Sequence, residues 1–398
     1  MIPRCESGDG TINWRPFVKF LNAFERNPQH LDVFELTLIW STTDALGIQE
    51  ISKALCRVLH WHPELVRIKT AWIPGDLLCT LSSLPQLQEL DLIFPASYGD
   101  AAIHFSDEGF KVLRKFTSSS YWSGNLCQVL MSIASTKLEN IDVEMNGARS
   151  MGDGALLLSP FVPAILKHAA SLRCLRLHPA ARGVTESWLR FRPVLQCSLM
   201  EDFEFVCDGF GLTDDEIDDI VNSWPLLKHL HVKPKEREVR LFMSTTQDER
   251  AARVSCRGLR RLAECSHLLS LTLPLDLTNP HNDNMDPQAT PGISLHSPLH
   301  SLDIGRAPFD MDAPDELEDF LRSIFPQLRN LSFERRTVGA TDHTGLHTLQ
   351  TSNKRWHILS TMRCNFLLPV VRRLPYKLLR KNGTMTYTHG VVYRQYMG

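Results

Sequence analysis

Two histidines stand two residues apart in the segment His60-Trp61-His62. In a β-strand their side chains would share one face, where two imidazoles and a third ligand can bind a metal ion. The residues before them have helical spacing, however, and Pro63 follows at once. A proline disfavours helical backbone in the residue before it. We therefore interpret the segment as the end of a helix and predict no metal site there.

A second run rich in oxygen ligands extends from His281 to Asp286, but it lacks the glycine and the terminal glutamate of a calcium-binding loop. It lies within residues 276–298, a stretch rich in Pro, Asn and Asp that is typical of a long loop. The glycine-rich phosphate-binding patterns and the Gly-x-Ser-x-Gly pattern of hydrolases do not occur in the sequence. The sequence thus predicts no catalytic site and no cofactor, and an enzyme is the most remote of the alternatives.

The 10 cysteines are scattered, and none forms a Cys-x-x-Cys pair. Several lie inside apolar runs, where a thiol behaves as a small buried apolar group. The polar start of the chain does not resemble a signal peptide. No run of about 18 apolar residues suggests a membrane span. These features predict a protein of a reducing compartment, the cytoplasm or the nucleus.

The net charge of -2 hides an asymmetry between the end of the chain and the rest. From Thr341 onward there are nine Lys or Arg residues against the single acid Asp342, which gives +8 there and leaves -10 for the remainder. An acidic body argues against nucleic acid along the main surface, because phosphate contacts need Lys and Arg. The basic segment itself could bind RNA, an acidic protein or anionic lipid, or be a solvated tail, or fold back on the acidic body.

One phrase recurs along the chain: Leu-x-x-Leu-x-Leu, often preceded by a proline. The first apolar residues of its copies are Leu31, Leu65, Leu87, Leu138, Leu172, Met200, Leu227, Leu268, Leu299 and Leu328. Most intervals are longer and less even than the roughly 20–29 residues of regular leucine-rich repeats. The long interval between Leu87 and Leu138 leaves two alternatives open, a degenerate unit or an insertion around residues 101–125.

The alternating part of the phrase predicts a short strand with one buried face. Between the copies lie helical patterns; Thr213 and Glu216, for example, have the spacing of a capping box, and Pro314 suits a first helical turn. Each unit therefore reads as helix, turn and strand, and no unit can bury its apolar face alone. We predict an α/β fold: an irregular leucine-rich-repeat solenoid, or horseshoe, with parallel strands on the concave face and helices on the convex face. The alternative is an ordinary α/β domain.

Three segments resemble the repeats of fungal F-box/leucine-rich-repeat proteins. They are Leu84-Pro85-Gln86-Leu87-Gln88-Glu89-Leu90, Trp224-Pro225-Leu226-Leu227-Lys228-His229-Leu230 and Phe325-Pro326-Gln327-Leu328-Arg329-Asn330-Leu331. The resemblance spans roughly residues 24–336. It implies repeats that capture substrates and an N-terminal F-box that docks a Skp1-type adaptor of a cullin–RING ubiquitin ligase. Residues 1–23 carry the apolar residues of one helix at most, and an F-box is not evident in them.

The middle residue of each Leu-x-Leu should point away from the core, and stacked parallel strands would align these residues as a ladder. They are Glu35, Lys69, Asp91, Asp142, Arg176, Glu204, His231, Thr272, Asp303 and Ser332. Acids predominate among them. Those expected to bind a partner are Asp91, Asp142, Arg176, Glu204, His231 and Asp303.

We therefore expect an N-terminal cap segment (1–23), a solenoid of about ten units (24–336) and a basic C-terminal tail or cap (337–398). Within the last segment, helices are expected over 354–362 and near 374–380. The predicted function is a non-catalytic protein-interaction scaffold resembling the substrate-recognition region of an F-box ubiquitin-ligase receptor. The alternative is a stand-alone leucine-rich-repeat binding protein with no ligase connection. In both cases the partner is an unknown protein.

Overall fold

The computed structural model describes residues 15–25, 31–36, 45–71, 76–94, 109–120, 123–145, 161–179, 188–207, 210–233, 253–277, 297–305, 314–335, 345–352 and 355–362. The chain divides into two compact units, Met1–Met362 and Arg363–Gly398, and every described residue belongs to the first. The loop expected at 276–298 and the helix expected near 374–380 lie largely or wholly outside the described residues.

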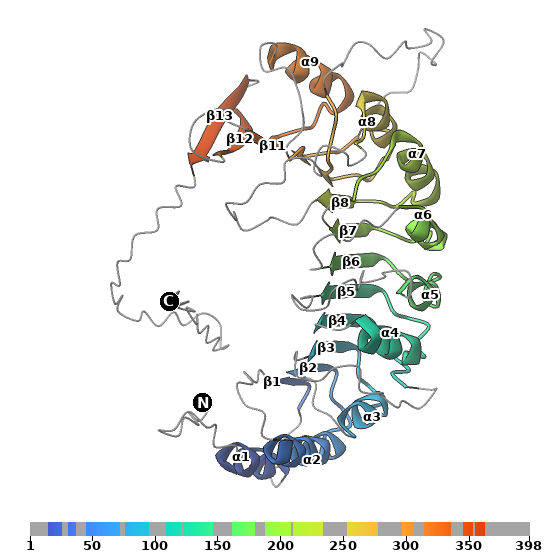
Figure 1. Cartoon of the computed structure of the whole chain (residues 1–398), viewed down its shortest axis with the longest axis vertical. Coiled ribbons are helices and arrows are strands. Elements are labelled where there is room, and N and C mark those ends of the chain that lie inside the picture. The colour runs from blue at the N-terminus through green and yellow to red at the C-terminus, as the bar shows by residue number, and fades with distance from the viewer. Residues whose placement is uncertain are drawn as a thin grey trace, which may run out of the picture. The chain divides into compact units, whose positions relative to one another are not determined.

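Within the described residues, one open sheet holds 13 strands in the order in which they occur along the chain (Figure 1). The first 11 are parallel to one another, and the last two are antiparallel. The strands are β1 (Val33–Leu36), β2 (Arg67–Ala71), β3 (Glu89–Phe94), β4 (Lys115–Ser120), β5 (Asn140–Met145), β6 (Cys174–Pro179), β7 (Asp202–Val206), β8 (His229–Lys233), β9 (Ser270–Thr272), β10 (Ser301–Asp303), β11 (Asn330–Arg335), β12 (Gly345–Ser352) and β13 (Arg355–Met362).

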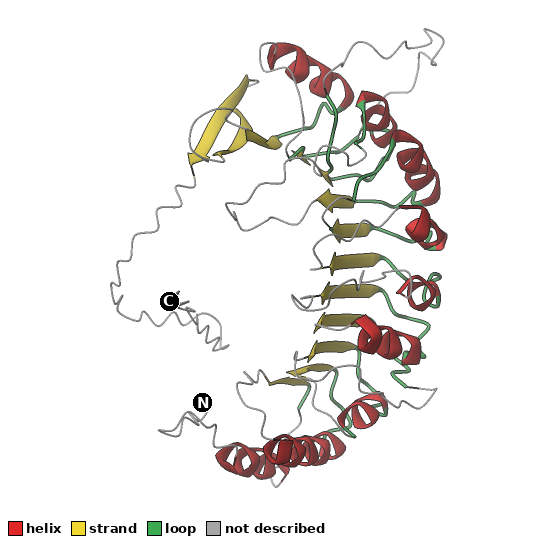
Figure 2. Ribbon diagram, in the orientation of Figure 1, coloured by secondary structure: helices red, strands yellow, loops and turns green. Residues whose placement is uncertain are grey.

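Helices connect most of the parallel strands, and Figure 2 shows them along one side of the row of strands. They are α1 (Arg15–Glu25), α2 (Ala45–Trp61), α3 (Leu77–Ser82), α4 (Ser123–Ser132), α5 (Phe161–Leu166), α6 (Trp188–Phe191), the 3₁₀-helix η1 (Arg192–Gln196), α7 (Asp214–Ser223), α8 (Cys256–Leu262) and α9 (Pro314–Ile324). Eight of the ten connections between parallel neighbours contain a described helix; those between β3 and β4 and between β9 and β10 run largely outside the described residues. The expected alternation of helix and strand is confirmed.

Every joint between successive parallel strands uses the same hydrogen bonds. At the β3–β4 joint, the backbone N–H groups of Arg114 and Lys115 both donate to the carbonyl of Gln88, at 2.8 and 2.9 Å. The corresponding pairs recur from the Asp32 carbonyl at the first joint to the His300 carbonyl at the last. The units therefore stack in one repeated geometry although their lengths differ.

A single hydrophobic core runs through the stack, from Phe17 in α1 to Leu331 in β11. Leu90, Leu175 and Leu230, which represent well-separated copies of the phrase, all belong to it and are 1% exposed or less. The prediction of one continuous leucine-lined interior is confirmed. Because each unit contributes only a few apolar side chains, neighbouring units must complete the burial.

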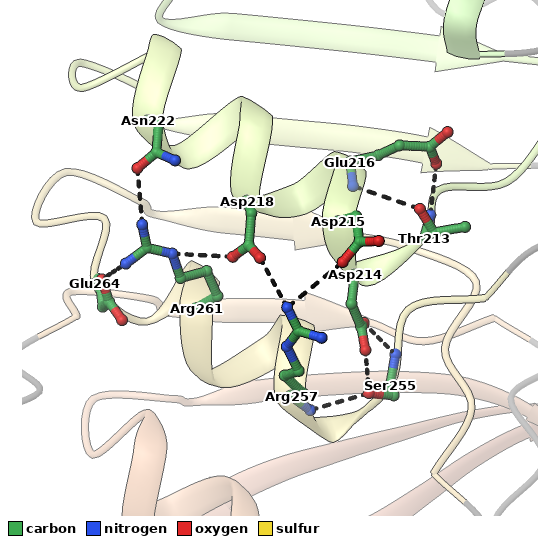
Figure 3. Close-up of polar contacts among 10 residues, drawn as sticks. All are labelled: Thr213, Asp214, Asp215, Glu216, Asp218, Asn222, Ser255, Arg257, Arg261 and Glu264. Carbon is green, nitrogen blue, oxygen red and sulfur yellow. Dashed lines mark hydrogen bonds and ion pairs between the residues drawn. The ribbon is translucent and has the colours of Figure 1, made fainter. Parts of the chain in front are cut away.

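The helix side carries a polar network between α7 and α8 (Figure 3). Helix α7 begins with the predicted capping box, in which Thr213 and Glu216 each accept a hydrogen bond from the other's backbone N–H. Arg257 and Arg261 of α8 bind the Asp218 carboxylate of α7, at 3.0 and 3.1 Å. Acids on one helix and bases on the next therefore join two consecutive units.

The long interval between Leu87 and Leu138 contains a degenerate unit. Its strand, β4, pairs between β3 and β5, so 11 parallel strands are present where the pattern revealed ten. Leu113 and Phe116 are buried at the first two apolar positions, but Ser118 occupies the third. The Ser118 hydroxyl donates to the Leu92 carbonyl at 2.8 Å, which satisfies the buried polar group. Because a serine replaces the expected apolar residue, the leucine pattern does not reveal this unit.

The helix expected over residues 354–362 is wrong, because this stretch forms strand β13. It pairs antiparallel with β12, which in turn pairs antiparallel with β11. Trp356, Ile358 and Met362 lie at the even spacing that suits a strand. Pairing with β12 also satisfies the backbone groups that β11 would leave exposed at the edge of the parallel sheet. The sheet thus continues past residue 336.

Candidate binding face of the sheet

The middle residues of the parallel strands stand in one uninterrupted row. Direct pairing runs from Glu35 opposite Lys69 to Asp303 opposite Ser332. The complete row reads Glu35, Lys69, Asp91, Thr117, Asp142, Arg176, Glu204, His231, Thr272, Asp303 and Ser332. The predicted alignment is therefore present, and Thr117 of β4 joins it. All six residues expected to bind a partner lie in this row; their role in binding stays a prediction.

Burial separates the two faces of each strand. In β3, β5 and β6 every second side chain is buried, and the side chains between them, including the middle row, are more exposed. We call this more exposed side the open face. Residues two positions before and after the middle row also lie on it, because side chains at i and i+2 share a face. This geometry adds Asp202, His178 and Lys233 to the candidate residues.

The first group of charges on the open face lies on β2 and β3. Arg67 pairs with Glu89 at 2.7 Å, and Lys69 pairs with Asp91 at 2.9 Å. The Asp91 carboxylate accepts a hydrogen bond from Lys69 and raises the pKa of that ammonium above its usual value. Each cation thus faces an acid on the neighbouring strand, and the group neutralises itself.

The second and denser group surrounds Glu204 on β6, β7 and β8. The carboxylate lies 3.4 Å from His178 Nε2, 3.6 Å from Lys233 Nζ and 3.8 Å from Arg176 Nε. His178 above all, and then Lys233 and His231, lower the pKa of Glu204 to about 2 against the opposing effect of burial. Arg176 also donates to Asp202 at 2.5 Å. We call His178, Arg176, Asp202, Glu204 and Lys233 the central cluster.

Asp142 adjoins the central cluster in the middle row, opposite Arg176. Burial raises the pKa of its carboxyl, although His178 and Arg176 act in the opposite direction. Two acids of one row, Asp142 and Glu204, therefore have pKa values shifted in opposite directions. The difference arises because His178 outweighs the effect of burial at Glu204, whereas burial outweighs the charges of His178 and Arg176 at Asp142.

His231 occupies the next position of the row beyond Glu204. Its Nδ1 lies 2.8 Å from the Thr272 hydroxyl, and its ring stacks on that of His229 with centroids 6.2 Å apart. Burial lowers the pKa of His231, and the nearby Glu204 partly opposes this shift. The imidazole thus contacts one residue of its own strand and one of β9.

A further set of charges lies on the turns that lead into β6, β7 and β8. Glu201 accepts hydrogen bonds from Arg173 and from Lys228, the latter at 2.6 Å. The pKa of Glu201 is lowered, first by Lys228 and then by Arg173. Arg173 and Lys228 thus straddle one carboxylate, in the same way that Arg176 and Lys233 straddle Glu204. We call Arg173, Glu201 and Lys228 the rim cluster.

The structure brings Asp142, Arg176, Glu204 and His231 together, but it separates the other two predicted residues from them. Asp91 pairs with Lys69 in the first group. Asp303, on β10, accepts a hydrogen bond from the backbone of Gly305 at 3.0 Å, where the positive φ of 55° suits glycine. Asp303 therefore helps to shape the turn after its strand.

The sequence analysis missed His178, Asp202, Lys233 and the rim cluster. Only the middle residue of each Leu-x-Leu phrase was expected to point away from the core. Extending each strand by two residues in both directions would have placed the first three on the same face. The rim residues directly precede the strands, and their alternating signs, + at Arg173, − at Glu201 and + at Lys228, are visible only when the units are aligned.

The other chemical candidates have structural explanations. Helix α2 ends at Trp61, as predicted, and His62 is buried with Nδ1 3.2 Å from a Glu64 carboxylate oxygen. Among the described residues, no group of three or more His, Cys, Asp or Glu could hold a metal ion. Burial raises the pKa of the Cys127 and Cys197 thiols to about 12, so they remain protonated at neutral pH. The run from His281 to Asp286 lies outside the described residues.

No protein-family model matches this sequence, and a search of curated proteins finds no significant match. In the part of the chain that the structure describes, none of the helices has both the length and the apolar character needed to cross a bilayer.

Proposed function

We propose that this chain is a non-catalytic protein-interaction scaffold, built as an irregular leucine-rich-repeat solenoid that binds a partner protein on its open face. The observation that carries the proposal is the uninterrupted row of middle residues across 11 parallel strands. Such a row presents a long series of side chains on one rigid surface, and repeat proteins use surfaces of this kind for binding. In the horseshoe that we propose, this surface is concave and the helices are convex.

The chemistry of the open face favours recognition over catalysis. Its acids and bases are engaged with one another: Glu204 with Lys233 and Arg176, and Asp91 with Lys69. A general acid or base needs a pKa near the working pH, whereas the pKa of Glu204 is about 2. Charged side chains that already hold defined positions are suited to select a partner by electrostatic complementarity.

The resemblance to F-box/leucine-rich-repeat proteins extends the proposal to a substrate receptor of a ubiquitin ligase, docked to a Skp1-type adaptor. The cysteines that the structure describes form no disulfide, which is typical of the cytoplasm or nucleus where such ligases act. Co-purification of the full chain with a Skp1-type adaptor tests this extension. Phe20, on α1 and 42% exposed, provides the variant: Phe20→Ser should weaken the complex without opening the core.

A stand-alone scaffold is the second candidate, and one observation favours it. Helix α1 buries Phe17 and Leu21 in the common core, so it serves as the N-terminal cap of the stack. A docking helix would instead keep its apolar side for the adaptor. If the full chain binds no Skp1-type adaptor, the ligase connection falls and the stand-alone scaffold remains.

The main proposal is tested by capturing partners on the purified full chain. Arg176→Glu combined with Lys233→Glu reverses two charges of the open face. Arg192→Glu is the matched control, because Arg192 is an exposed arginine of η1 that pairs with Asp219 on the helix side. The wild type and the control should capture the same proteins, and the open-face variant should lose them. Identical capture by all three would show that the open face is not the binding surface.

A further inference from the structure

The number of acids and bases on the open face does not show which of them a partner would meet. Although acids predominate in the middle row, the basic side chains reach further into solvent than the acids they bind. In the central cluster the Arg176 side chain is 41% exposed and that of Asp202 is 16% exposed, while Lys233 is 45% exposed above Glu204 at 19%. In the rim cluster Lys228 is 44% exposed and Glu201 23%. Over β6–β8 the basic side chains are therefore more exposed than the acids with which they pair.

These cations form two pairs, each arranged about one carboxylate. Arg173 and Lys228 flank Glu201, and Arg176 and Lys233 flank Glu204. Both carboxylates belong to the same unit, three residues apart along the chain, and the flanking cations come from the units on either side. Neighbouring strands lie about 4.8 Å apart, so the two cations of each pair, which belong to the units of β6 and β8, are separated by about two strand spacings.

The central cluster also retains hydrogen-bonding capacity. Arg176 Nε and His178 Nε2 are buried, and neither has a hydrogen-bond partner among the described residues. They lie 3.8 and 3.4 Å from the Glu204 carboxylate, and His178 is the main cause of the lowered pKa of Glu204. An arginine offers five N–H donors and a lysine three, and the internal pairs occupy only part of that number. Additional carboxylate oxygens could bind the exposed parts of the Arg176 and Lys233 side chains, which are 41% and 45% exposed.

We propose that the open face over β6–β8 binds a carboxylate-rich peptide segment of a partner protein, with its acids bound by the Arg173–Lys228 and Arg176–Lys233 pairs. This inference rests on the proposed function and specifies the chemistry of the partner. Charge-assisted hydrogen bonds from arginine to carboxylate are among the stronger polar contacts in proteins, and arginine can bind a carboxylate with two donors. The segment would thus be recognised by directed contacts at the cationic tips.

Nucleic acid fits the same cations less well. Glu201, Asp202, Glu204 and Asp142 lie beside the four cations, so the local net charge is close to zero. Binding a phosphodiester backbone draws its free energy from release of counterions, which requires a surplus of positive charge on the protein. A short acidic peptide carries far fewer condensed counterions and depends on individual pairs. Binding on this surface therefore depends on individual contacts with the four cations, which a short acidic peptide can make.

Fluorescence anisotropy of the full chain with a labelled peptide of alternating Glu and Ala tests the proposal. A Lys–Ala peptide and a single-stranded oligonucleotide of equal length serve as comparison probes. The Glu–Ala peptide should bind best, and Arg176→Glu with Lys233→Glu should weaken it about tenfold or more, since close charge pairs dominate such contacts. Arg192→Glu should leave the affinity within about twofold, as expected for an exposed pair away from the site.

The variant Glu204→Gln distinguishes a role of this cluster in binding from a role in folding alone. This variant removes the internal acid that competes for Arg176, His178 and Lys233. The affinity for the Glu–Ala peptide should therefore rise several-fold, whereas loss of fold would lower it. An unchanged or lower affinity in a variant with a native circular dichroism spectrum would overturn the proposal, as would equal binding of the oligonucleotide. If the acidic peptide does not bind but partner capture still depends on Arg176 and Lys233, the scaffold stands and the acidic-segment inference fails.

Discussion

The helix side and the open face both carry networks of arginine–carboxylate pairs, but the two networks are arranged differently. Between α7 and α8, acids lie on one helix and bases on the next, and Arg261 binds both Asp218 and Asn222 of the neighbouring unit (Figure 3). In the central cluster of the open face, each cation lies on a strand whose register the backbone hydrogen bonds already determine. The pairs on the helix side therefore help to specify packing, whereas those on the open face can exchange with a partner.

The largest expected loss of stability comes from placing a charged residue at a buried strand position. Leu90→Asp places an unpaired charge in the common core, where the leucine is 1% exposed. Burying a charge without a partner costs several kcal/mol, so we expect destabilisation by more than about 4 kcal/mol. Thermal unfolding followed by circular dichroism measures it. The adjacent Asp91→Asn, on the open face, should cost no more than about 1 kcal/mol, because it removes one exposed pair. Equal melting temperatures for the two variants would contradict the assignment of the two faces.

The next effect concerns the contact of α7 with α8. A Cβ added at Gly258 would lie 2.5 Å from both Asp214 Oδ1 and Val254 Cγ1. Asp214 must then move, although its carboxylate holds the backbone N–H and the hydroxyl of Ser255, the N-cap of α8. Gly258→Ala should therefore destabilise the protein by about 1–3 kcal/mol, the usual range for overpacking. In a free helix the same change would be stabilising.

A double-mutant cycle determines whether Asp214 causes that loss. With Asp214→Ala already present, the added methyl group of Gly258→Ala has more room, so the two effects should sum to less than their separate values. Urea unfolding of the four proteins measures the coupling. Full additivity would mean that the glycine does not need the close approach of Asp214.

These contrasts also explain what the sequence could predict. The capping box of Thr213 and Glu216 is local, and its spacing in the sequence was sufficient to place it. The row of middle residues followed from the stacking of identical phrases. Strand β4 was not evident because Ser118 replaces an apolar residue, and its burial depends on a carbonyl from the preceding unit. The central cluster was only partly found, because His178 and Lys233 reach Glu204 from other strands, and such distances become known only once the units are in register.

A smaller effect is expected from the central cluster, and it depends on pH. The pKa of Glu204 is about 2 in the folded protein, below the unfolded value of 4.5. The ionised carboxylate therefore stabilises the fold above pH 4.5, and this contribution is lost as the pH falls from about 4.5 towards 2. Allowing for solvent screening, it amounts to about 1–2 kcal/mol. Glu204→Gln should lower the free energy of unfolding by that amount at neutral pH. The difference from the wild type should shrink on acidification, and a constant difference across this range would refute the assignment.

The smallest effect has the opposite sign and comes from the neighbour of Glu204 in the same row. Burial raises the pKa of Asp142, so the folded state binds its proton more readily than the unfolded chain does. The ionised carboxylate therefore slightly opposes folding, and this cost is absent below the unfolded pKa and develops as the pH rises through the raised folded pKa. Asp142→Asn should leave stability unchanged or raise it by less than about 1 kcal/mol at neutral pH, an upper bound set by one half-buried group. Because Asp142 also adjoins the cations of β6, the same variant should bind the Glu–Ala peptide at least as tightly as the wild type does.

Urea unfolding of Asp142→Asn beside Glu204→Gln measures the difference between the two acids. A clear loss of stability in Asp142→Asn would mean that Asp142 is paired as closely as Glu204 and that the two acids of the row are equivalent.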